Sequence, residues 1–203
     1  MFYRPGTDDP KPTHSPIKAI VSPRPIGWIS TRNADGSANL APYSFFNAIS
    51  DNPPMVMFGS TGGKPDRAFG KDTLANIQAS GEFVVNIVSR ELVDAMNLTS
   101  GDYAAGQDEF ELAGLEKAPC HVVDVPRVAA SPAALECRLW RIIDLPGGEN
   151  RMAIGQVVGV HIDDRFMEND MLNVAAYQPV ARLGYRDYVA VEQLFQLRRP
   201  GQK

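Results

Sequence analysis

Short apolar segments separated by turn signals run through most of the 203 residues, and this pattern most constrains the fold. Segments 26–31, 55–58 and 83–88 have the length and composition of strands, and Asp-Gly and Pro-Pro turn pairs lie between the first two. Residues 135–139 alternate apolar and charged side chains, and a Pro-Gly-Gly turn leads to an apolar segment at 152–162, which predicts a β-hairpin. Strands and helices do not alternate regularly, so a parallel doubly wound sheet is disfavoured and an antiparallel barrel fits better.

A few short helices are expected beside the strands. Asp72 or Thr73 is a suitable first residue for a helix that carries Leu74 and Ile77 on one face and ends at Gly81. The sequence therefore predicts a mainly β protein with short helices attached to its barrel.

The chain divides into an arm and one domain. Residues 1–16 contain four prolines, which block both helix and central strand, so they are expected to form an extended N-terminal arm. Residues 17–203 are long enough for a single well-buried domain. Within this domain Ser89 is a candidate cap for a second helix, and the polar residues 99–114 are expected to form a loop.

Composition excludes several classes of protein. The formal net charge of −4 argues against a nucleic-acid surface. The longest apolar stretches are too short to span a bilayer, and the first 16 residues lack the apolar core of a signal peptide, so no membrane partner and a cytoplasmic location are expected. Cys120 and Cys137 show no C-x-x-C or zinc-ligand spacing, so the sequence predicts two buried thiols and no metal.

Familiar catalytic motifs are missing from the sequence. Residues 59–65 resemble a phosphate loop, but they are one residue short between the outer glycines, and Pro65 stands where a Mg²⁺-binding hydroxyl belongs. No G-x-G-x-x-G or G-x-S-x-G motif occurs, so neither a Rossmann site nor a nucleophile elbow is supported.

Two short segments carry the strongest functional signal. Lys71 supplies a point charge and Thr73 a hydroxyl at an expected helix start, where unpaired N–H groups and the helix dipole favour a phosphate. The alternative is a capped surface helix with a solvated lysine. Residues 39–46 combine aromatic side chains with Pro42, which is expected to prevent regular pairing and to leave backbone groups free for a flat ring system. The alternative there is a bulged core strand.

The order of the segments resembles the flavin reductase-like family, over roughly residues 17–190. The segments that carry this resemblance are Ser22-Pro23-Arg24-Pro25-Ile26, Ile29-Ser30-Thr31, Asp35-Gly36, Asn39-Leu40-Ala41-Pro42-Tyr43-Ser44-Phe45-Phe46-Asn47, Asn52-Pro53-Pro54, Lys71-Asp72-Thr73, Asn76-Ile77, Gly81-Glu82-Phe83-Val84-Val85-Asn86 and Gly155-Gln156-Val157-Val158 with His161. The resemblance implies a six-stranded antiparallel split β-barrel of Greek-key type and a homodimer with FMN near the subunit interface. Flavoredoxin-like proteins are the most similar branch.

The same resemblance implies which residues bind FMN. One group is expected along the flavin ring and the ribityl chain: Asn39, Leu40, Ala41, Pro42, Tyr43, Ser44, Phe45, Phe46 and Asn47, with Ser30 and Thr31 beside them. A second group is expected at the phosphate: Ser60, Lys71 and Thr73. His161 is a candidate for the nicotinamide or substrate side, or else a histidine of the barrel rim, and no catalytic side chain is required beyond FMN.

The leading functional hypothesis is an NAD(P)H:flavin oxidoreductase that transfers a hydride from NADH or NADPH to flavin and passes electrons to an acceptor, which could be a protein. The alternatives are an FMN electron carrier reduced by a protein partner and a flavin-binding protein without turnover. Gln156 stands where a glutamate is expected, and the Gly-Asp-His triplet of some NADH-dependent relatives does not occur. These departures leave the electron donor open.

Overall fold

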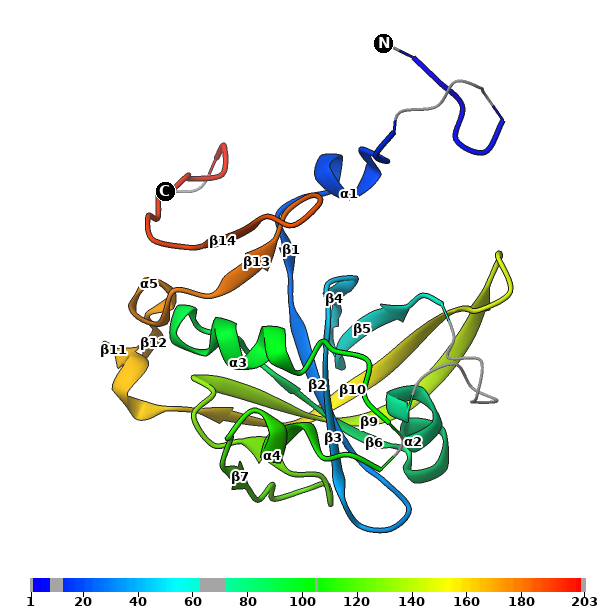
Figure 1. Ribbon diagram of the computed structural model, residues 1–203. Helices are drawn as coiled ribbons and strands as arrows, with labels where there is room; N and C mark the ends of the chain where they lie inside the picture. The colour runs from blue at the N-terminus through cyan, green and yellow to red at the C-terminus, as the bar shows by residue number, and fades with distance from the viewer. Residues whose placement is uncertain (1, 8–12, 63–71, 105, 202–203) are drawn as a thin grey trace.

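The computed structural model describes residues 2–7, 13–62, 72–104 and 106–201, and one antiparallel sheet of seven strands forms its centre (Figure 1). The strand order is β3-β2-β6-β9-β10-β5-β4. These strands are β2 (Gly27–Arg32), β3 (Ala38–Tyr43), β4 (Phe46–Asp51), β5 (Pro54–Ser60), β6 (Glu82–Asn86), β9 (Ala133–Leu145) and β10 (Asn150–Ile162).

The sheet curls so that its two ends approach each other. Although β3 and β5 are not hydrogen-bonded neighbours in the strand order, residues of the two strands contact each other. The prediction of a mainly β fold with an antiparallel split barrel is confirmed. The described residues form seven strands in this sheet, one more than the six expected.

Smaller elements surround the barrel. The helices are α1 (Ile17–Ile20), α2 (Asp72–Ser80), α3 (Val93–Leu98), α4 (Glu109–Leu112) and α5 (Val174–Tyr177), with the 3-10 turns η1 (Arg90–Leu92) and η2 (Asp164–Phe166). The minor sheets pair β1 (Arg24–Pro25) with β13 (Val180–Arg182) and β13 with β14 (Tyr188–Ala190), β7 (Lys117–Ala118) with β8 (Arg127–Val128), and β11 (Met167–Glu168) with β12 (Met171–Leu172). None of the helices within the described residues has the length and apolar character needed to cross a membrane.

The two faces of the sheet pack against different elements. On the inner face, α2 places Leu74 and Ile77 in a core with side chains of the barrel strands such as Phe83. On the outer face, Trp28 and Leu40 pack with residues of α3 and α4. Because side chains alternate along a strand, neighbouring residues in β2, β3 and β6 serve opposite faces.

The β9–β10 hairpin contains two bulges, and the second one sets which face its residues serve. The register passes from Val157 opposite Cys137 to Gly159 opposite Glu136, so Val158 is the extra residue. An inserted residue moves every later side chain of the strand to the other face. Gly155 therefore lies on the inner face, against Phe83, whereas Gly159 lies on the outer face, against Glu136.

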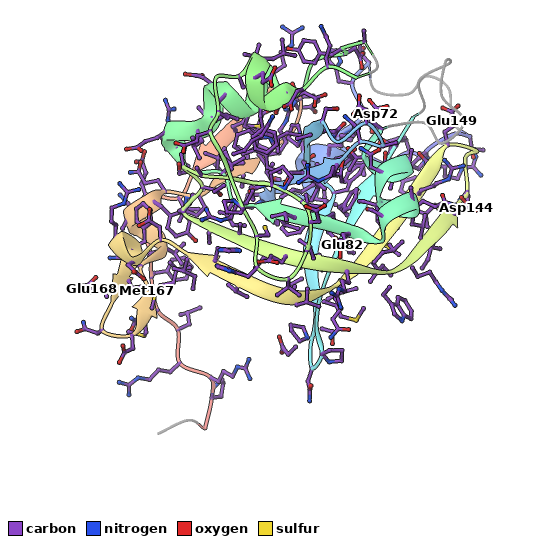
Figure 2. The ribbon with its side chains drawn as sticks, turned by 90° about the horizontal axis from the view of Figure 1, so that it is seen from below. Asp72, Glu82, Asp144, Glu149, Met167 and Glu168 are labelled. Carbon is purple, nitrogen blue, oxygen red and sulfur yellow. The ribbon has the colours of Figure 1, made fainter. Side chains whose placement is uncertain are left out.

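Several local predictions are confirmed and one is wrong. The hairpin forms as expected and reaches further at both ends, and α2 ends at Gly81, which has a φ of 74°. Figure 2 shows Asp144 and Glu149 at the tip of this hairpin, at the opposite end of the molecule from Met167 and Glu168. Residues 99–114 were expected to be loop, but they contain α4. The division into an arm at 1–16 and one domain stays a prediction.

Candidate functional site

Four polar side chains that the sequence singles out converge on the inner face, and we call them the inner polar cluster: Asn39, Tyr43, Ser60 and Thr73. Asn39 Nδ2 donates to Thr73 Oγ1 at 3.1 Å, and the Tyr43 hydroxyl lies near enough to the hydroxyls of Thr73 and Ser60 for both to affect its pKa. All four residues are at most 5% exposed. Strand β3, the end of β5 and the first turn of α2 thus meet through neutral polar groups.

The strand alternation explains why these residues meet. Asn39 and Tyr43 are four positions apart in β3 and so point to the same face. Thr73 precedes Leu74, which packs in the inner core, and this anchors the first turn of α2 against β3. The first N–H groups of a helix lack partners within the helix, and the dipole makes that end favourable for an anion.

Tyr43 gives the cluster its electrostatic character. Burial raises the pKa of Tyr43 to about 12, with a smaller contribution in the same direction from the Glu109 carboxylate, while the nearby hydroxyls of Thr73 and Ser60 act against it. The phenol is therefore neutral at physiological pH. A cluster of neutral hydroxyl and amide groups suits the oxygens of a phosphate or of a polyol chain.

Thr31 extends the inner polar cluster, whereas Ser30 does not belong to it. Thr31 lies directly opposite Asn39 in the β2–β3 register, and its Oγ1 accepts from Asn76 Nδ2 at 2.9 Å. Ser30 points to the outer face, where its Oγ donates to the carbonyl of Pro126 at 2.7 Å and accepts from Asn86 Nδ2 at 3.1 Å. Of these two predicted residues, only Thr31 has its side chain on the side of the cluster.

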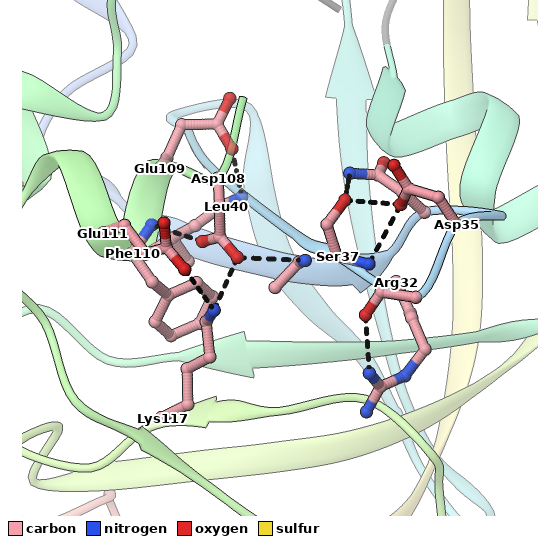
Figure 3. Close-up of polar contacts among 12 residues, drawn as sticks. Arg32, Asp35, Ser37, Leu40, Asp108, Glu109, Phe110, Glu111 and Lys117 are labelled. Atoms are coloured by element: carbon pink, nitrogen blue, oxygen red, sulfur yellow. Dashed lines mark hydrogen bonds and ion pairs between the residues drawn. The ribbon is translucent and has the colours of Figure 1, made fainter. Parts of the chain in front are cut away.

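The free edge of β3 is closed by carboxylates, as Figure 3 shows. The N–H of Leu40 donates to Glu109 Oε2 at 3.0 Å, and the N–H of Ala38 donates to Asp108 Oδ2 at 3.2 Å. Pro42 is the next residue on this edge, and it has no N–H to satisfy. Asp108 also caps α4 by accepting from the N–H of Phe110 at 3.0 Å.

The expectation that Pro42 prevents regular pairing is therefore wrong. Pro42 pairs with Trp28 in an uninterrupted register because β3 is an edge strand of the sheet, where a missing N–H costs nothing. The N–H groups of Ala38 and Leu40 also have partners, so β3 does not offer them to a ring system. The candidate ring contacts move to the turn that follows β3.

That turn presents Phe45 beside two cations. Phe45 is 36% exposed, and its ring centroid lies 5.7 Å from Lys18 Nζ and 6.0 Å from Arg24 Cζ. Arg24 itself is buried and donates to the carbonyls of Lys18, Val21 and Leu183. Burial lowers the pKa of Arg24, with a smaller contribution from nearby Arg182, yet its carbonyl partners identify it as a structural tie rather than a free phosphate ligand.

The remaining residues of the segment differ in exposure. Ala41 packs partly buried against the inner core, and Phe46 is buried close to Gly27, where a Cβ would lie 2.8 Å from the Phe46 ring. Ser44 is half-buried, whereas Asn47 is exposed and its Oδ1 accepts from the N–H of Ala48 at 2.9 Å. The segment thus combines core residues with a surface turn.

Two pockets adjoin the inner polar cluster on different sides. A polar pocket of about 90 Å³ is lined by Asn39, Ala41, Pro42, Tyr43, Asp72, Thr73, Thr99, Ser100, Gly101, Asp102 and Glu109. An apolar pocket of about 410 Å³ is lined by Phe45, Met57, Gly59, Ser60, Thr61, Leu145, Pro146, Asn150, Arg151 and Met152. Tyr43 lines the first and Ser60 the second, so the cluster lies between them.

The charges around the polar pocket bear directly on phosphate binding. Asp72, Asp102 and Glu109 all line it, and no cation is among the described residues of its lining. Lys71, the predicted phosphate ligand, lies outside the described residues. An anion held beside Thr73 therefore depends on a cation such as Lys71 to offset the nearby carboxylates.

His161 lies in a separate group on the outer face, which we call the outer charged cluster: Cys120, His121, Glu136 and His161. His161 Nε2 contacts Glu136 Oε1 at 2.6 Å, and its ring stacks on that of His121 with 5.3 Å between centroids. The Val158 bulge places His161 and Glu136 on the same face, the one opposite the inner polar cluster. Of the two interpretations of His161, this placement favours the barrel-rim histidine over a nicotinamide contact.

Glu136 is ionised despite being buried. Burial alone would raise its pKa, but hydrogen bonds from the N–H groups of His121, Val122 and Val123 and from His161 lower the pKa of Glu136 to about 2. Burial, together with the Glu136 carboxylate, raises the pKa of the Cys120 thiol to about 12. The negative charge of this cluster is therefore that of the Glu136 carboxylate, which backbone N–H groups hold in place.

Sequence reasoning missed two contributors to the inner site. Asn76, one turn after Thr73, donates through Nδ2 to both Thr31 and Asn33. The spacing of Thr73 and Asn76 on one helix face was the available signal. Glu109 lies in a segment expected to be loop, and no local pattern indicated that its carboxylate would reach β3.

The curled antiparallel sheet with two separate edge strands defines a split-barrel protein. A family model described as "Flavin reductase like domain" matches residues 21–180, and the chain therefore belongs to the flavin reductase-like family. Nitrilotriacetate monooxygenase component B of Bacillus cereus is 30% identical, with a TM-score of 0.88 over 97% of this chain and 98% of that one. The 2-nitrobenzoate 2-nitroreductase NbaA of Pseudomonas fluorescens is 32% identical, with a TM-score of 0.81 over 91% and 89%.

Flavoredoxin of Desulfovibrio vulgaris (Miyazaki F) shares the fold, with 21% identity and a TM-score of 0.78 over the full length of both chains. The resemblance to the flavin reductase-like family is confirmed, whereas the likeness to flavoredoxin shows the fold alone. The chain is accordingly a member of a family of flavin-related oxidoreductases.

Proposed function

We propose that this protein binds FMN at the inner polar cluster and uses it as an NAD(P)H-dependent oxidoreductase. The observation that carries the proposal is the buried set of neutral hydroxyl and amide groups that joins β3, β5 and the start of α2. A chain of the flavin reductase-like family has a clear use for such a set, since FMN combines a phosphate and a polyol chain with a ring. When bound, FMN supplies the hydride-accepting chemistry.

The residues present fit the parts of FMN. The Thr73 hydroxyl and the first N–H groups of α2 are suited to the phosphate, together with the charge of Lys71. Ser60, Tyr43 and Asn39 supply neutral donors and acceptors for the phosphate end and the ribityl hydroxyls. The turn at Ser44 and Phe45 and the start of β4 lie at the end of β3, where the isoalloxazine ring is expected.

The protein's own contribution to the reaction is to bind, orient and shield. No proton has to be moved by a side chain for hydride transfer, which agrees with a site built from neutral groups. The apolar pocket beside Ser60 offers a water-poor surface, lined by Phe45, Met57 and Met152, for an aromatic partner of the flavin. We include NADH and NADPH as equal candidates for the reductant.

The test of this function is the absorption spectrum of the purified protein under anaerobic conditions, before and after each nicotinamide is added. A flavin spectrum that bleaches rapidly with NADH or NADPH is expected. A flavin that is reduced only by dithionite or by a reduced protein would instead identify an electron carrier, or a flavin-binding protein without turnover. Transfer of electrons to an added acceptor separates these two.

The site assignment has its own test. Thr73→Val keeps the shape of the side chain and removes the hydroxyl, so FMN affinity should fall by about 1.5–3 kcal/mol, the size of a hydrogen bond to a charged group. Lys71→Ala should weaken binding by a similar amount. Ser30→Ala is the matched control, because its hydroxyl lies on the outer face and its loss should leave the FMN dissociation constant unchanged. An unchanged constant in Thr73→Val would contradict the assignment.

We also propose a homodimer, as the family resemblance implies. Large apolar side chains exposed on β9 and β10 support this, with Trp140 60% and Val160 59% exposed. Phe45, in the turn of the proposed site, is exposed as well. Light scattering coupled to size-exclusion chromatography should give twice the mass of one chain, and a monomer with FMN fully bound would contradict the proposal.

A further inference from the structure

Three side chains of metal-binding type converge in the outer charged cluster. The Sγ of Cys120, a carboxylate oxygen of Glu136 and a ring nitrogen of His161 all lie within 4.8 Å of one another. Cys120 belongs to the segment after β7, Glu136 to β9 and His161 to β10. The convergence joins three separate parts of the chain and lies on the face of the sheet opposite the inner polar cluster.

We propose that Cys120, Glu136 and His161 form a site for one Zn²⁺ ion, independent of flavin. Thiolate, imidazole and carboxylate are the protein ligands that Zn²⁺ takes, and the mixture of sulfur and nitrogen favours it over Mg²⁺ or Ca²⁺. Binding converts the Cys120 thiol to a thiolate and releases its proton to solvent. The thiolate and the Glu136 carboxylate together neutralise the 2+ charge, so the filled site carries no net charge in its partly buried position.

The carboxylate of Glu136 is already oriented for this role. Its Oε2 accepts from the N–H groups of Val122 and Val123 at 2.6 and 2.9 Å, and its Oε1 accepts from the N–H of His121 at 2.9 Å. These donors can stay in place when a metal binds. The only contact that must be exchanged is that of His161 Nε2 with Oε1, because the metal takes the position between them and the ring proton then resides on Nδ1.

The cluster is reachable from solvent. The side chain of His161 is 15% exposed while that of Glu136 is 1% exposed, so the site opens through the imidazole side. Cys120 also lines an open pocket of about 300 Å³, which offers an entry path. The fourth position of a tetrahedral site falls to water or to the ring of His121, which is exposed and stacked on His161.

The place of the site in the fold indicates a structural role. Cys120 and the three backbone donors belong to one segment, residues 120–123, which covers Val84 and Ala134 on the outer face. A metal bound by Cys120, Glu136 and His161 would join this segment to β9 and β10 through metal–ligand bonds, in addition to the hydrogen bonds that the backbone makes to Glu136. Zn²⁺ should therefore stabilise the protein to unfolding without being needed for FMN reduction.

The direct test is titration of the purified full-length protein with Zn²⁺ in competition with a chromophoric chelator. One equivalent per chain with a dissociation constant of about 10 µM or tighter is expected, and weaker or non-stoichiometric binding would overturn the proposal. Co²⁺ provides a second readout. A thiolate-to-cobalt charge-transfer band should appear in a difference spectrum from which the flavin absorption cancels, and its absence would also count against the site.

Zn²⁺ affinities of ligand and control variants distinguish this site from nonspecific metal binding. Cys120→Ser and His161→Gln should each weaken Zn²⁺ binding by at least about 10-fold, whereas Cys137→Ala and His14→Gln should not. Cys137 is a suitable control because it is next to Glu136 in sequence but buried on the inner face. Equal affinity in Cys120→Ser and wild type would overturn the proposal.

The rate of cysteine alkylation in the wild-type protein gives a test that does not depend on whether the variants fold. Saturating Zn²⁺ should slow the alkylation of Cys120, followed by mass spectrometry of the peptide that contains it, at least about 10-fold. The buried Cys137 serves as the internal reference in the same sample. An unchanged rate at Cys120 would refute a thiolate ligand.

Discussion

The barrel holds two polar clusters on opposite faces of the same sheet, and each keeps a buried group stable in a different way: Tyr43 in the inner cluster and Glu136 in the outer one. The inner polar cluster contains hydroxyls and an amide, and burial raises the pKa of its one titratable member, Tyr43, further above its already alkaline value. The outer charged cluster contains a carboxylate that stays ionised because backbone N–H groups and His161 hydrogen-bond with it. Neutral groups can exchange their hydrogen bonds for those of a ligand, whereas a buried carboxylate can give up a donor only where a cation takes its place.

This difference assigns the two faces different roles. Neutral groups lose little free energy when they exchange a hydrogen bond within the protein for one to a ligand, so the inner polar cluster suits a bound cofactor. A charge held by the N–H groups of three consecutive residues suits a structural tie between a loop and the sheet. Substitutions on the outer face should therefore change stability most, and substitutions on the inner face should change ligand binding most.

The largest expected effect is that of Glu136→Gln. An amide NH₂ would face at least one backbone donor now paired with the carboxylate, so the free energy of unfolding should fall by roughly 3 kcal/mol. Urea denaturation in the presence of a chelator measures this without any contribution from bound metal.

Glu82→Gln is the matched control for Glu136→Gln. Glu82 lies on the neighbouring strand β6, accepts one backbone N–H from the residue that follows that segment, that of Asp124 at 2.9 Å, and is partly exposed. Its loss should cost less than about 1 kcal/mol. Equal effects for the two variants would remove the distinction between a buried tie and an ordinary surface contact.

Glycines on the two faces of β10 provide the next comparison. In Gly155→Ala the new Cβ would lie 2.4 Å from Cζ of Phe83, which is fully buried and cannot move aside. In Gly159→Ala the closest atom is Cδ of Glu136 at 3.1 Å. Thermal and urea unfolding should show a loss of about 1–3 kcal/mol for Gly155→Ala and a smaller loss for Gly159→Ala. The reverse order would mean that the bulge at Val158 does not set the faces as described.

The sequence was sufficient for the elements that local patterns determine. The β9–β10 hairpin follows from its alternation and its turn, and α2 follows from its helix start, Leu74, Ile77 and Gly81. Asn39 and Thr73 were singled out separately, and the structure places them in hydrogen-bonding contact. These features depend on neighbours close in sequence or on a face that periodicity defines.

Other features depend on contacts that no local pattern encodes. The four residues of α4 are too few for a periodic signal, and their position is set by the carboxylates of Asp108 and Glu109 on the edge of β3. Pro42 looked like an interruption because its place on an edge strand is decided by the whole sheet. The convergence of Cys120 and His161 arises only after the Val158 bulge turns the end of β10 to the outer face.

The smallest expected effect concerns pH and tests the neutral character of the inner cluster. Because the folded-state pKa of Tyr43 is raised from 10.0 to about 12, the folded state favours the neutral phenol. Its contribution to stability is complete below pH 10 and is lost as the pH rises through 12, with about 1.4 kcal/mol lost by pH 11. Tyr43→Phe has no phenol to ionise, so this part of the alkaline decline should be missing from its urea-unfolding profile between pH 8 and 11.

Tyr177→Phe is the control, and its dependence of unfolding free energy on pH is compared with that of Tyr43→Phe. Burial also raises the pKa of Tyr177, and that residue packs against Phe166, away from the cluster. FMN should raise the wild-type curve without removing its alkaline decline, since the decline comes from ionisation of the phenol in the unfolded chain, which does not bind FMN. If wild type and Tyr43→Phe decline in parallel, the inner cluster does not hold Tyr43 neutral, and its contrast with the outer charged cluster fails at its central residue.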